Sequence, residues 1–219
     1  MLSKRVNLFV SFEGIEGSGK TTQARMLFEL LKAKGIPCVL TREPGGTRIG
    51  EQIREILLCK KNSSLVPLAE LFLYEADRAQ HFEEVIRPSL LRGMWVISDR
   101  CFDATLAYQG TGRGLDWDLL KGLNQLASSG LMPDITFLID CPPQIGLKRA
   151  KDRAETQLVG GGLDRFEREE LGFHHRVREA YIHLAKGEKR FCILDGLKDP
   201  STIHEKIVQE IRERFDIGL

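Results

Sequence analysis

The sequence lacks an excess of charge of either sign. Its 219 residues include 32 lysines and arginines and 31 aspartates and glutamates, which gives a formal net charge of +1. A protein that holds a nucleic-acid backbone by neutralising many phosphates carries a more basic balance. We therefore expect no nucleic-acid partner, and we expect any anion site to be local.

The sequence also lacks a cysteine pattern and a long apolar run. Its five cysteines are odd in number and widely spaced, without a CxxC pair or a zinc-ligand spacing. Thiols of this kind fit a reducing compartment. No run approaches the roughly 18 apolar residues of a membrane span, and residues 1–12 read into a strand rather than a signal peptide. We predict a cytoplasmic protein without a membrane partner.

Short β-rich apolar runs alternate with longer segments of helical spacing. The helical spacing is clearest over 24–31 and 203–215. The apolar runs are 6–12, 37–41, 94–98, 134–140 and 190–194. This alternation predicts an α/β fold, in which a five-stranded parallel sheet carries helices on both faces. The length favours one large domain over residues 1–219.

Residues 14–21 match the phosphate-loop pattern GxxxxGK[ST]. They follow an apolar run and open a helical segment, so backbone N–H groups and the helix N-terminus converge on phosphate oxygens. We expect the lysine to reach the β- and γ-phosphates and the threonine hydroxyl to ligate Mg²⁺. The alternative is a glycine-rich turn that only caps a helix. The predicted ATP-binding residues are Gly14, Ile15, Glu16, Gly17, Ser18, Gly19, Lys20 and Thr21.

The phosphate loop alone does not separate a kinase from a GTPase or a motor-type ATPase. Asp99 and Arg100 follow the predicted strand 94–98, at the edge where a parallel sheet places its ligands. The carboxylate there suits Mg²⁺, bound through water, and the guanidinium suits an acceptor phosphate. The alternative is an ion pair on the surface.

The helical segment around Tyr74 has two faces of different chemistry. Tyr74, Asp77, Arg78 and His81 share one face, opposite to the apolar face that includes Phe72. The polar face is suited to stacking a flat base and hydrogen-bonding its edge. The alternative is a solvated face.

The segment 148–168 is rich in charge and has a net charge of +2. Arg149 and Arg153 lie one helical turn apart, and the glycines at 160–162 allow the segment to close over a triphosphate. The alternative is an ordinary solvated helix.

Seven separate stretches resemble thymidylate kinases, and the resemblance runs nearly end to end. Arg-Glu-Pro-Gly-Gly at 42–46 and Tyr-Gln-Gly at 108–110 are more specific than the phosphate loop, because other phosphate-loop enzymes lack them. The stretches are 12–22, 41–47, 76–81, 99–100, 106–110, 133–134 and 163–166. The resemblance, to the bacterial type, implies a three-layer P-loop kinase fold with a mobile lid at about 148–165, Mg²⁺ with ATP as donor, and a homodimer.

The resemblance also implies how a thymine base is bound. Tyr74 would stack on the ring, and Pro44 would line its pocket. Arg78, Thr105 and Gln109 would read its polar edge.

For the rest of the acceptor, the resemblance implies that three arginines hold the phosphate, namely Arg42, Arg54 and Arg100. Glu16 would lie near the sugar 3′-hydroxyl, and Tyr108 would crowd the position of a ribose 2′-hydroxyl.

In the bacterial-type members that the chain resembles, the catalytic arginine comes from the lid. The phosphate loop here offers no arginine, which leaves Arg153 as first choice and Arg149 as second. Together with Lys20, Asp99 and Arg100, these form the expected catalytic set, and Thr21 and Asp99 form the expected metal set.

The implied reaction is ATP + dTMP → ADP + dTDP, a step in dTTP biosynthesis. Three candidate cations at the acceptor favour a phosphorylated acceptor over a free nucleoside. The alternatives are another nucleoside monophosphate or deoxynucleoside kinase on the same scaffold and, more remotely, a P-loop switch ATPase. No Asn-Lys-x-Asp motif for reading guanine is present.

Overall fold

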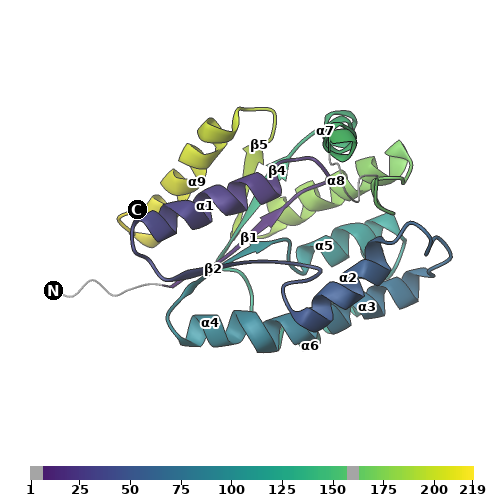
Figure 1. Cartoon of the computed structure of the whole chain (residues 1–219), viewed down its shortest axis with the longest axis horizontal. Helices are drawn as coiled ribbons and strands as arrows, with labels where there is room; N and C mark the ends of the chain where they lie inside the picture. Colours follow the sequence, from purple (N-terminus) through teal and green to yellow (C-terminus); the bar gives the residue numbers. More distant parts are fainter. Residues whose placement is uncertain (1–6, 157–162) are drawn as a thin grey trace.

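The computed structural model describes residues 7–156 and 163–219 of the chain (Figure 1). These residues contain a parallel sheet with the strand order β2-β3-β1-β4-β5. The strands are β1 (Phe9–Glu13), β2 (Cys38–Arg42), β3 (Trp95–Asp99), β4 (Ile135–Asp140) and β5 (Phe191–Asp195). The predicted five-stranded α/β fold is confirmed. The strands end at, or one residue beyond, the predicted ends, and Val6 of the first predicted strand lies outside the described residues.

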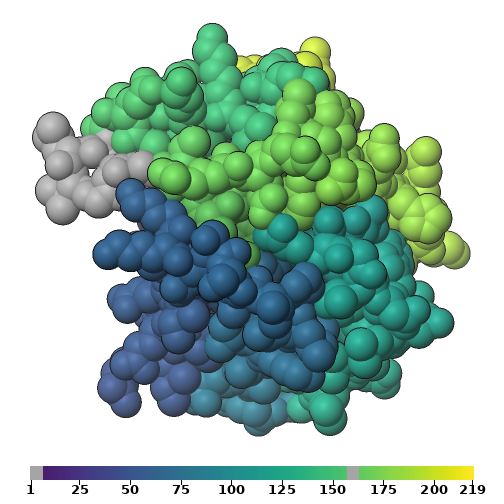
Figure 2. Space-filling view, turned by 90° about the vertical axis from the view of Figure 1, so that its right-hand side faces the viewer, coloured from purple at the N-terminus to yellow at the C-terminus, as the bar shows by residue number. Residues whose placement is uncertain are grey.

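Helices connect the strands and cover both faces of the sheet (Figure 1). The α-helices are α1 (Lys20–Ala33), α2 (Arg48–Leu58), α3 (Pro67–His81), α4 (Arg87–Leu91), α5 (Asp103–Thr105), α6 (Trp117–Ala127), α7 (Pro143–Thr156), α8 (Leu171–Gly187) and α9 (Pro200–Phe215). Two π-helical segments, η1 (Phe82–Ile86) and η2 (Leu106–Gly112), continue α3 and α5. Seen from the side, α8 in lime lies between α7 in green and the blue surface of α2 and α3 (Figure 2).

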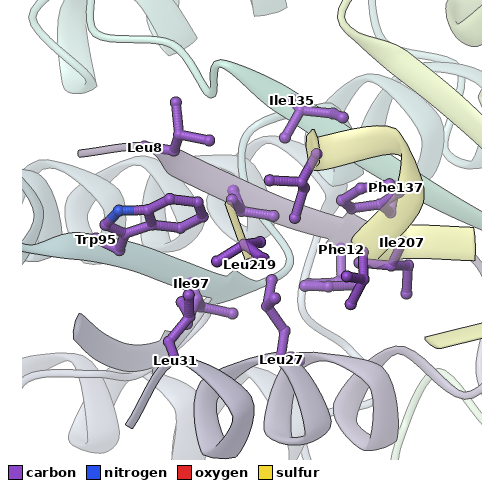
Figure 3. Packing of buried hydrophobic residues seen from close by; sticks show 14 of the residues in the cluster. Leu8, Phe12, Leu27, Leu31, Trp95, Ile97, Ile135, Phe137, Ile207 and Leu219 are labelled. Carbon is purple, nitrogen blue, oxygen red and sulfur yellow. The ribbon is translucent and has the colours of Figure 1, made fainter. Parts of the chain in front are cut away.

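The core on the α1 and α9 face is a continuous apolar layer (Figure 3). Alternate residues of β1 point into it, and the ring of Phe12 stacks on that of Phe137 at 5.5 Å between centroids. Leu27 of α1 and Ile207 of α9 are fully buried against these rings. Burial of one such side chain contributes about 1.5–3 kcal/mol, so this layer fixes α1, and with it the phosphate loop, on the sheet.

The opposite face of the sheet is packed by α3, α6, α8, η1 and η2. Phe9 of β1 meets Phe82 edge to face at 5.9 Å, and Leu138 of β4 joins the cluster around Phe173 of α8. Ser11 and Glu13 of β1 are buried on this side. The sheet therefore presents polar groups toward the helices that carry the predicted acceptor residues.

The strand order places the site. β3 and β4 flank β1 on opposite sides, so the order in which strands are added to the sheet changes direction at β1. Ligands of open α/β sheets bind at such a point, outside the carboxyl ends of the strands. The phosphate loop follows β1 there. Among the described residues, no helix is long and apolar enough to cross a membrane.

Candidate active site

The phosphate loop runs from β1 into α1, which begins at Lys20. Gly17 has a φ of +67°, and a Cβ at this position would lie 2.0 Å from the carbonyl oxygen of Gly146 in α7. A side chain is thus excluded by both backbone conformation and space. The Lys20 ammonium donates to the Ile15 carbonyl at 2.7 Å. Burial, reinforced by repulsion from Arg100, lowers the pKa of Lys20 to about 8.

Thr21 and Asp99 meet at the ends of α1 and β3. The Thr21 hydroxyl donates a hydrogen bond to Oδ2 of Asp99. A hydroxyl and a carboxylate are hard oxygen donors, which suit Mg²⁺ when substrate phosphates and water supply the remaining ligands. The described residues contain no cluster of three or more His, Cys, Asp or Glu side chains that would hold a metal by themselves. The donor set therefore fits a cation that arrives with a nucleotide.

Arg100 is held in a fixed orientation by four acceptors. Its guanidinium donates to the Gly14 carbonyl at 2.9 Å, to Glu16 Oε1 at 3.0 Å, and to the hydroxyls of Tyr108 and Tyr181 at 3.1 Å each. Its backbone has a φ of +74°, in the left-handed region that few non-glycine residues adopt. Arg100 is not part of a surface ion pair with Asp99, so that alternative is wrong.

Glu13 supports this conformation from behind. Its Oε1 accepts from the Cys101 backbone N–H at 2.7 Å, and its Oε2 accepts from the Tyr181 hydroxyl at 2.7 Å. Burial, with repulsion from Asp103, raises the pKa of Glu13 to about 8. Sequence reasoning missed Glu13 and Tyr181, because a glutamate inside an apolar strand and a tyrosine 81 residues beyond Arg100 show no common pattern.

Glu16 of the phosphate loop contacts Arg100, Tyr108 and His174. Its Oε1 accepts from the Tyr108 hydroxyl at 2.6 Å in addition to Arg100, and its Oε2 lies 3.2 Å from Nδ1 of His174. Burial alone would raise the pKa of Glu16, but His174, Arg100 and Lys20 together outweigh burial and lower it to about 2. Glu16 is therefore a carboxylate at neutral pH.

Arg78 of α3 is buried within a hydrogen-bonding network of four partners. It is 1% exposed and donates to Glu43 at 3.0 Å, Glu75 at 2.8 Å, Asn124 at 2.8 Å and the Thr105 hydroxyl at 3.0 Å. Although burial lowers the pKa of the guanidinium, Glu75 and Glu43 outweigh this and raise it. The network fixes the group that lines the site.

The two faces of α3 are reversed relative to an ordinary amphipathic helix. Asp77, Arg78 and His81 are buried, whereas Leu68 and Phe72 are 46% and 54% exposed. The interpretation of the polar face as a solvated one is therefore wrong. On the polar face, Arg78 and His81 pair with Glu43 inside the protein, and the apolar face remains open.

Tyr74 and Gln109 lie at the same end of the site. The Tyr74 ring is tilted against Phe166 at 6.3 Å, and burial raises the pKa of its hydroxyl. The Gln109 amide donates to Glu70 Oε1 at 2.6 Å. The other oxygen of Glu70 accepts from Arg165 at 2.5 Å, which links the 163–166 stretch to α3.

Arg42 and Arg54 reach the site from β2 and α2. Arg42 pairs with both carboxylate oxygens of Glu51, at 2.8 and 2.9 Å, while Arg54 donates to the Pro44 carbonyl at 2.8 Å. Arg42 is half exposed, so this pair is weak and can exchange for a ligand anion.

The two arginines of α7 have different partners. Arg149 donates to the carbonyl of Gly196, beyond β5, at 2.9 Å, and Arg153 donates to Glu167 Oε1 at 2.7 Å. The predicted lid at 148–165 includes residues 157–162, which contain the predicted glycine-rich loop and lie outside the described residues. The closing of the lid stays a prediction. Sequence reasoning missed Glu167 and Gly196.

One cavity of about 600 Å³ joins these groups. Of the predicted site residues, those that line it are Glu16, Gly17, Ser18, Gly19, Lys20, Thr21, Arg42, Pro44, Arg54, Tyr74, Arg78, Asp99, Arg100, Tyr108, Gln109, Arg149 and Arg153. Gly14, Ile15 and Thr105 lie behind this lining: Gly14 and Ile15 offer carbonyls to Arg100 and Lys20, and Thr105 offers its hydroxyl to Arg78. Lining residues that were not predicted include Asp164, Phe166 and Lys198.

A parallel sheet, a phosphate loop with its lysine and hydroxyl, and a second group of buried cations in the same cavity define a P-loop nucleotide kinase. The thymidylate kinase family model matches residues 12–207 of the chain. The chain is 53% identical over 199 residues to a thymidylate kinase of Carboxydothermus hydrogenoformans, covering 91% of this chain and 94% of that protein. It is 55% identical over 189 residues to one of Geotalea daltonii, covering 86% and 88%.

A solved structure gives the same result. The crystal structure of thymidylate kinase from Ehrlichia chaffeensis matches with a TM-score of 0.75 and 34% identity, covering 94% of this chain and 98% of that one. The chain belongs to the thymidylate kinase family.

Proposed function

We propose that this chain transfers the γ-phosphoryl group of ATP to dTMP, giving ADP and dTDP for dTTP synthesis. One observation carries the proposal. One cavity is lined both by the phosphate loop and by Arg78 and Tyr74, and Arg100 lines it as well. Family membership and curated relatives at 50% identity and above support the same reaction.

On the donor side, backbone N–H groups of residues 14–21 and the Lys20 ammonium would bind the ATP phosphates. Thr21 and Asp99 would hold Mg²⁺ together with those phosphates. When bound, Mg²⁺ neutralises negative charge on the phosphoryl oxygens. Arg149 and its partner Gly196 line the same cavity.

On the acceptor side, Arg42, Arg54 and Arg100 would hold the dTMP phosphate, and Tyr74 would stack on thymine. Arg78 and Gln109 line the pocket for the base edge, Thr105 supports Arg78 from behind, and Pro44 forms part of the wall. Aromatic stacking on a base is worth about 1–3 kcal/mol.

For the sugar, Glu16 would lie near the 3′-hydroxyl. The Tyr108 ring, held by its hydroxyl against Glu16, would exclude a 2′-hydroxyl.

Phosphoryl transfer requires little covalent chemistry from the protein, so rate comes from positioning and charge neutralisation. Lys20 would stabilise charge on the transferring group from the donor side. Arg153 is our first choice for the lid cation that approaches it, with Arg149 second. Arg100 would hold the acceptor phosphate in line despite the repulsion between two anions.

The experiment is ADP release with Mg-ATP and, in separate wells, dTMP, dUMP, AMP, GMP, CMP, UMP and thymidine. A strong preference for dTMP is expected. Preference for thymidine or another monophosphate would overturn the acceptor assignment while keeping the kinase. ADP release without an acceptor, and without a phosphorylated product, would indicate an ATPase.

We also propose that the chain forms a homodimer through the apolar face of α3 and neighbouring helices. Leu68 and Phe72 of α3 and Leu119 of α6 are 46%, 54% and 47% exposed. Exposed apolar groups of this size on neighbouring helices favour a protein partner. A second copy of the chain agrees with the homodimer that the resemblance to thymidylate kinases implies. Sedimentation of the F72E variant as a monomer is expected. We further propose one cytoplasmic domain over the whole chain.

A further inference from the structure

His174 of α8 is a buried histidine that the proposed reaction does not use. It is 0% exposed, and its Nδ1 lies 3.2 Å from Oε2 of Glu16. Among the described residues, neither ring nitrogen has a hydrogen bond of normal geometry, and neither does Glu16 Oε2. Buried polar atoms without partners are rare in folded proteins. Here two of them face each other, and one belongs to Glu16, which lines the nucleotide cavity.

The other oxygen of Glu16 is already fully used. Oε1 accepts from Tyr108 at 2.6 Å and from Arg100 at 3.0 Å. The carboxylate is therefore in contact with His174 on one side and with the acceptor-side groups on the other. Any rotation of Glu16 about its terminal bond changes the contact with Arg100.

We propose that His174 is a positioning residue, which fixes the Glu16 carboxylate and through it orients Arg100 toward the acceptor phosphate. This rests on the proposed function. Nδ1 supplies the donor that Oε2 lacks, in a buried environment in which the Phe173 ring packs against the His174 ring. Without that donor, the carboxylate turns or takes up a proton, and both changes loosen its grip on Arg100.

The position of the donor atom gives a sharp test. The amide nitrogen of Asn lies near the position of Nδ1, whereas that of Gln lies nearer to Nε2, and Phe has no donor but fills a similar volume. We expect H174F and H174Q to lower kcat/KM for dTMP about tenfold or more, the usual effect of losing a hydrogen bond to a charged group. H174N is expected to stay within about threefold of wild type, and KM for ATP to change little in all three.

A double-mutant cycle tests the route through Glu16. Because His174 acts through that carboxylate, H174F is expected to have less than a twofold effect on kcat/KM for dTMP in an E16A background. A full tenfold loss there, or wild-type kinetics of H174F alone, would overturn the proposal. If H174F does not fold, equal losses in H174N and H174Q would also overturn it.

The control is H175F at the neighbouring position. His175 contacts Gln144 outside the cavity, so its replacement is expected to leave both KM values unchanged. The dissociation constant of dTMP is measured by calorimetry for every variant. This measurement reports the contribution of Arg100 to dTMP binding in the absence of turnover. If the wild type prefers another monophosphate, the cycle is run with that nucleotide, which separates failure of this inference from failure of the acceptor assignment.

Discussion

Nη2 of Arg153 lies 2.7 Å from Oε1 of Glu167, and the two side chains differ in environment: the arginine is 55% exposed and the glutamate 7%. Burial, reinforced by Asp164, raises the pKa of Glu167. The buried carboxylate thus anchors a half-exposed cation in the lining of the cavity. Because its guanidinium is half exposed, we expect Arg153 to be able to leave Glu167 for a phosphoryl group.

The first prediction concerns this arginine. R153A is expected to lower kcat about a hundredfold or more and to leave KM for dTMP nearly unchanged, because the cation acts on the transferring group rather than on the bound acceptor. Steady-state kinetics with both substrates provide the measurement. K151A, on the exposed side of the same helix, is the control. Equal turnover of R153A and wild type would remove Arg153 from the mechanism.

The second prediction concerns pH. The pKa of Lys20 is lowered to about 8, so the free enzyme loses the charged form of this side chain above that pH. We expect kcat/KM for ATP to fall as pH rises through about 8, whereas kcat falls only at higher pH, because bound phosphates stabilise the ammonium. Glu13 also has a pKa of about 8. The fall should therefore persist in E13Q, and a profile that stays flat to about pH 9.5 would contradict this reading.

The third prediction concerns stability of the Arg78 network. R78M leaves the carboxylates of Glu43 and Glu75 buried without their cation, which typically costs about 3–5 kcal/mol. For a chain of this size, Tm is expected to fall by about 6–20 °C. Arg87 pairs with Glu83 on the surface, so R87M serves as the matched control with an effect below about 1 kcal/mol. Similar urea midpoints for the two variants would show that the network is not stabilising.

The fourth prediction concerns Asp77, which is 1% exposed. Its Oδ1 accepts from the Gly45 N–H at 2.9 Å, and its Oδ2 has no partner among the described residues. Burial, with repulsion from Glu43, raises the pKa of Asp77 to about 7. A raised carboxyl pKa means that the folded state binds the proton more tightly than the unfolded state. The contribution of this proton to the free energy of unfolding is therefore fully present below pH about 4, and it is lost as pH rises through about 7.

D77N removes this titration and keeps the acceptor for Gly45. We expect the Tm of the variant to exceed that of wild type at pH 8 and to exceed it by less at pH 5. The upper limit of the gain in free energy of unfolding is about 1.4 kcal/mol for each pH unit between the pKa values of Asp77 in the unfolded and folded states. Thermal unfolding at both pH values measures the difference. E84Q on the exposed surface should show no such dependence. A gain that is equal at pH 5 and pH 8 would be incompatible with the assignment.

Much of the donor half of the site could be predicted from local sequence. The phosphate loop occupies eight consecutive residues, and its function depends on backbone N–H groups that adjacent residues supply. The five strands were equally predictable, because strand and helix have different apolar periods. The burial of α3 could not be predicted in this way. Periodicity places Asp77, Arg78 and His81 on one face. It does not reveal that Glu43, far away in sequence, pairs with Arg78 and His81, or that Asn124 accepts a hydrogen bond from Arg78.

The sequence by itself determined the fold class, the phosphate loop and, through its resemblance to a known family, the reaction and most of the residues around the cavity. Only the tertiary structure decided how those residues are held. Arg100 is oriented by Gly14, Glu16, Tyr108 and Tyr181, which come from three separate segments. Hydrogen bonds depend on distances and angles between atoms, and buried charges on the partners that surround them. Neither follows from spacing along the chain, so both appear only once the strands and helices have packed.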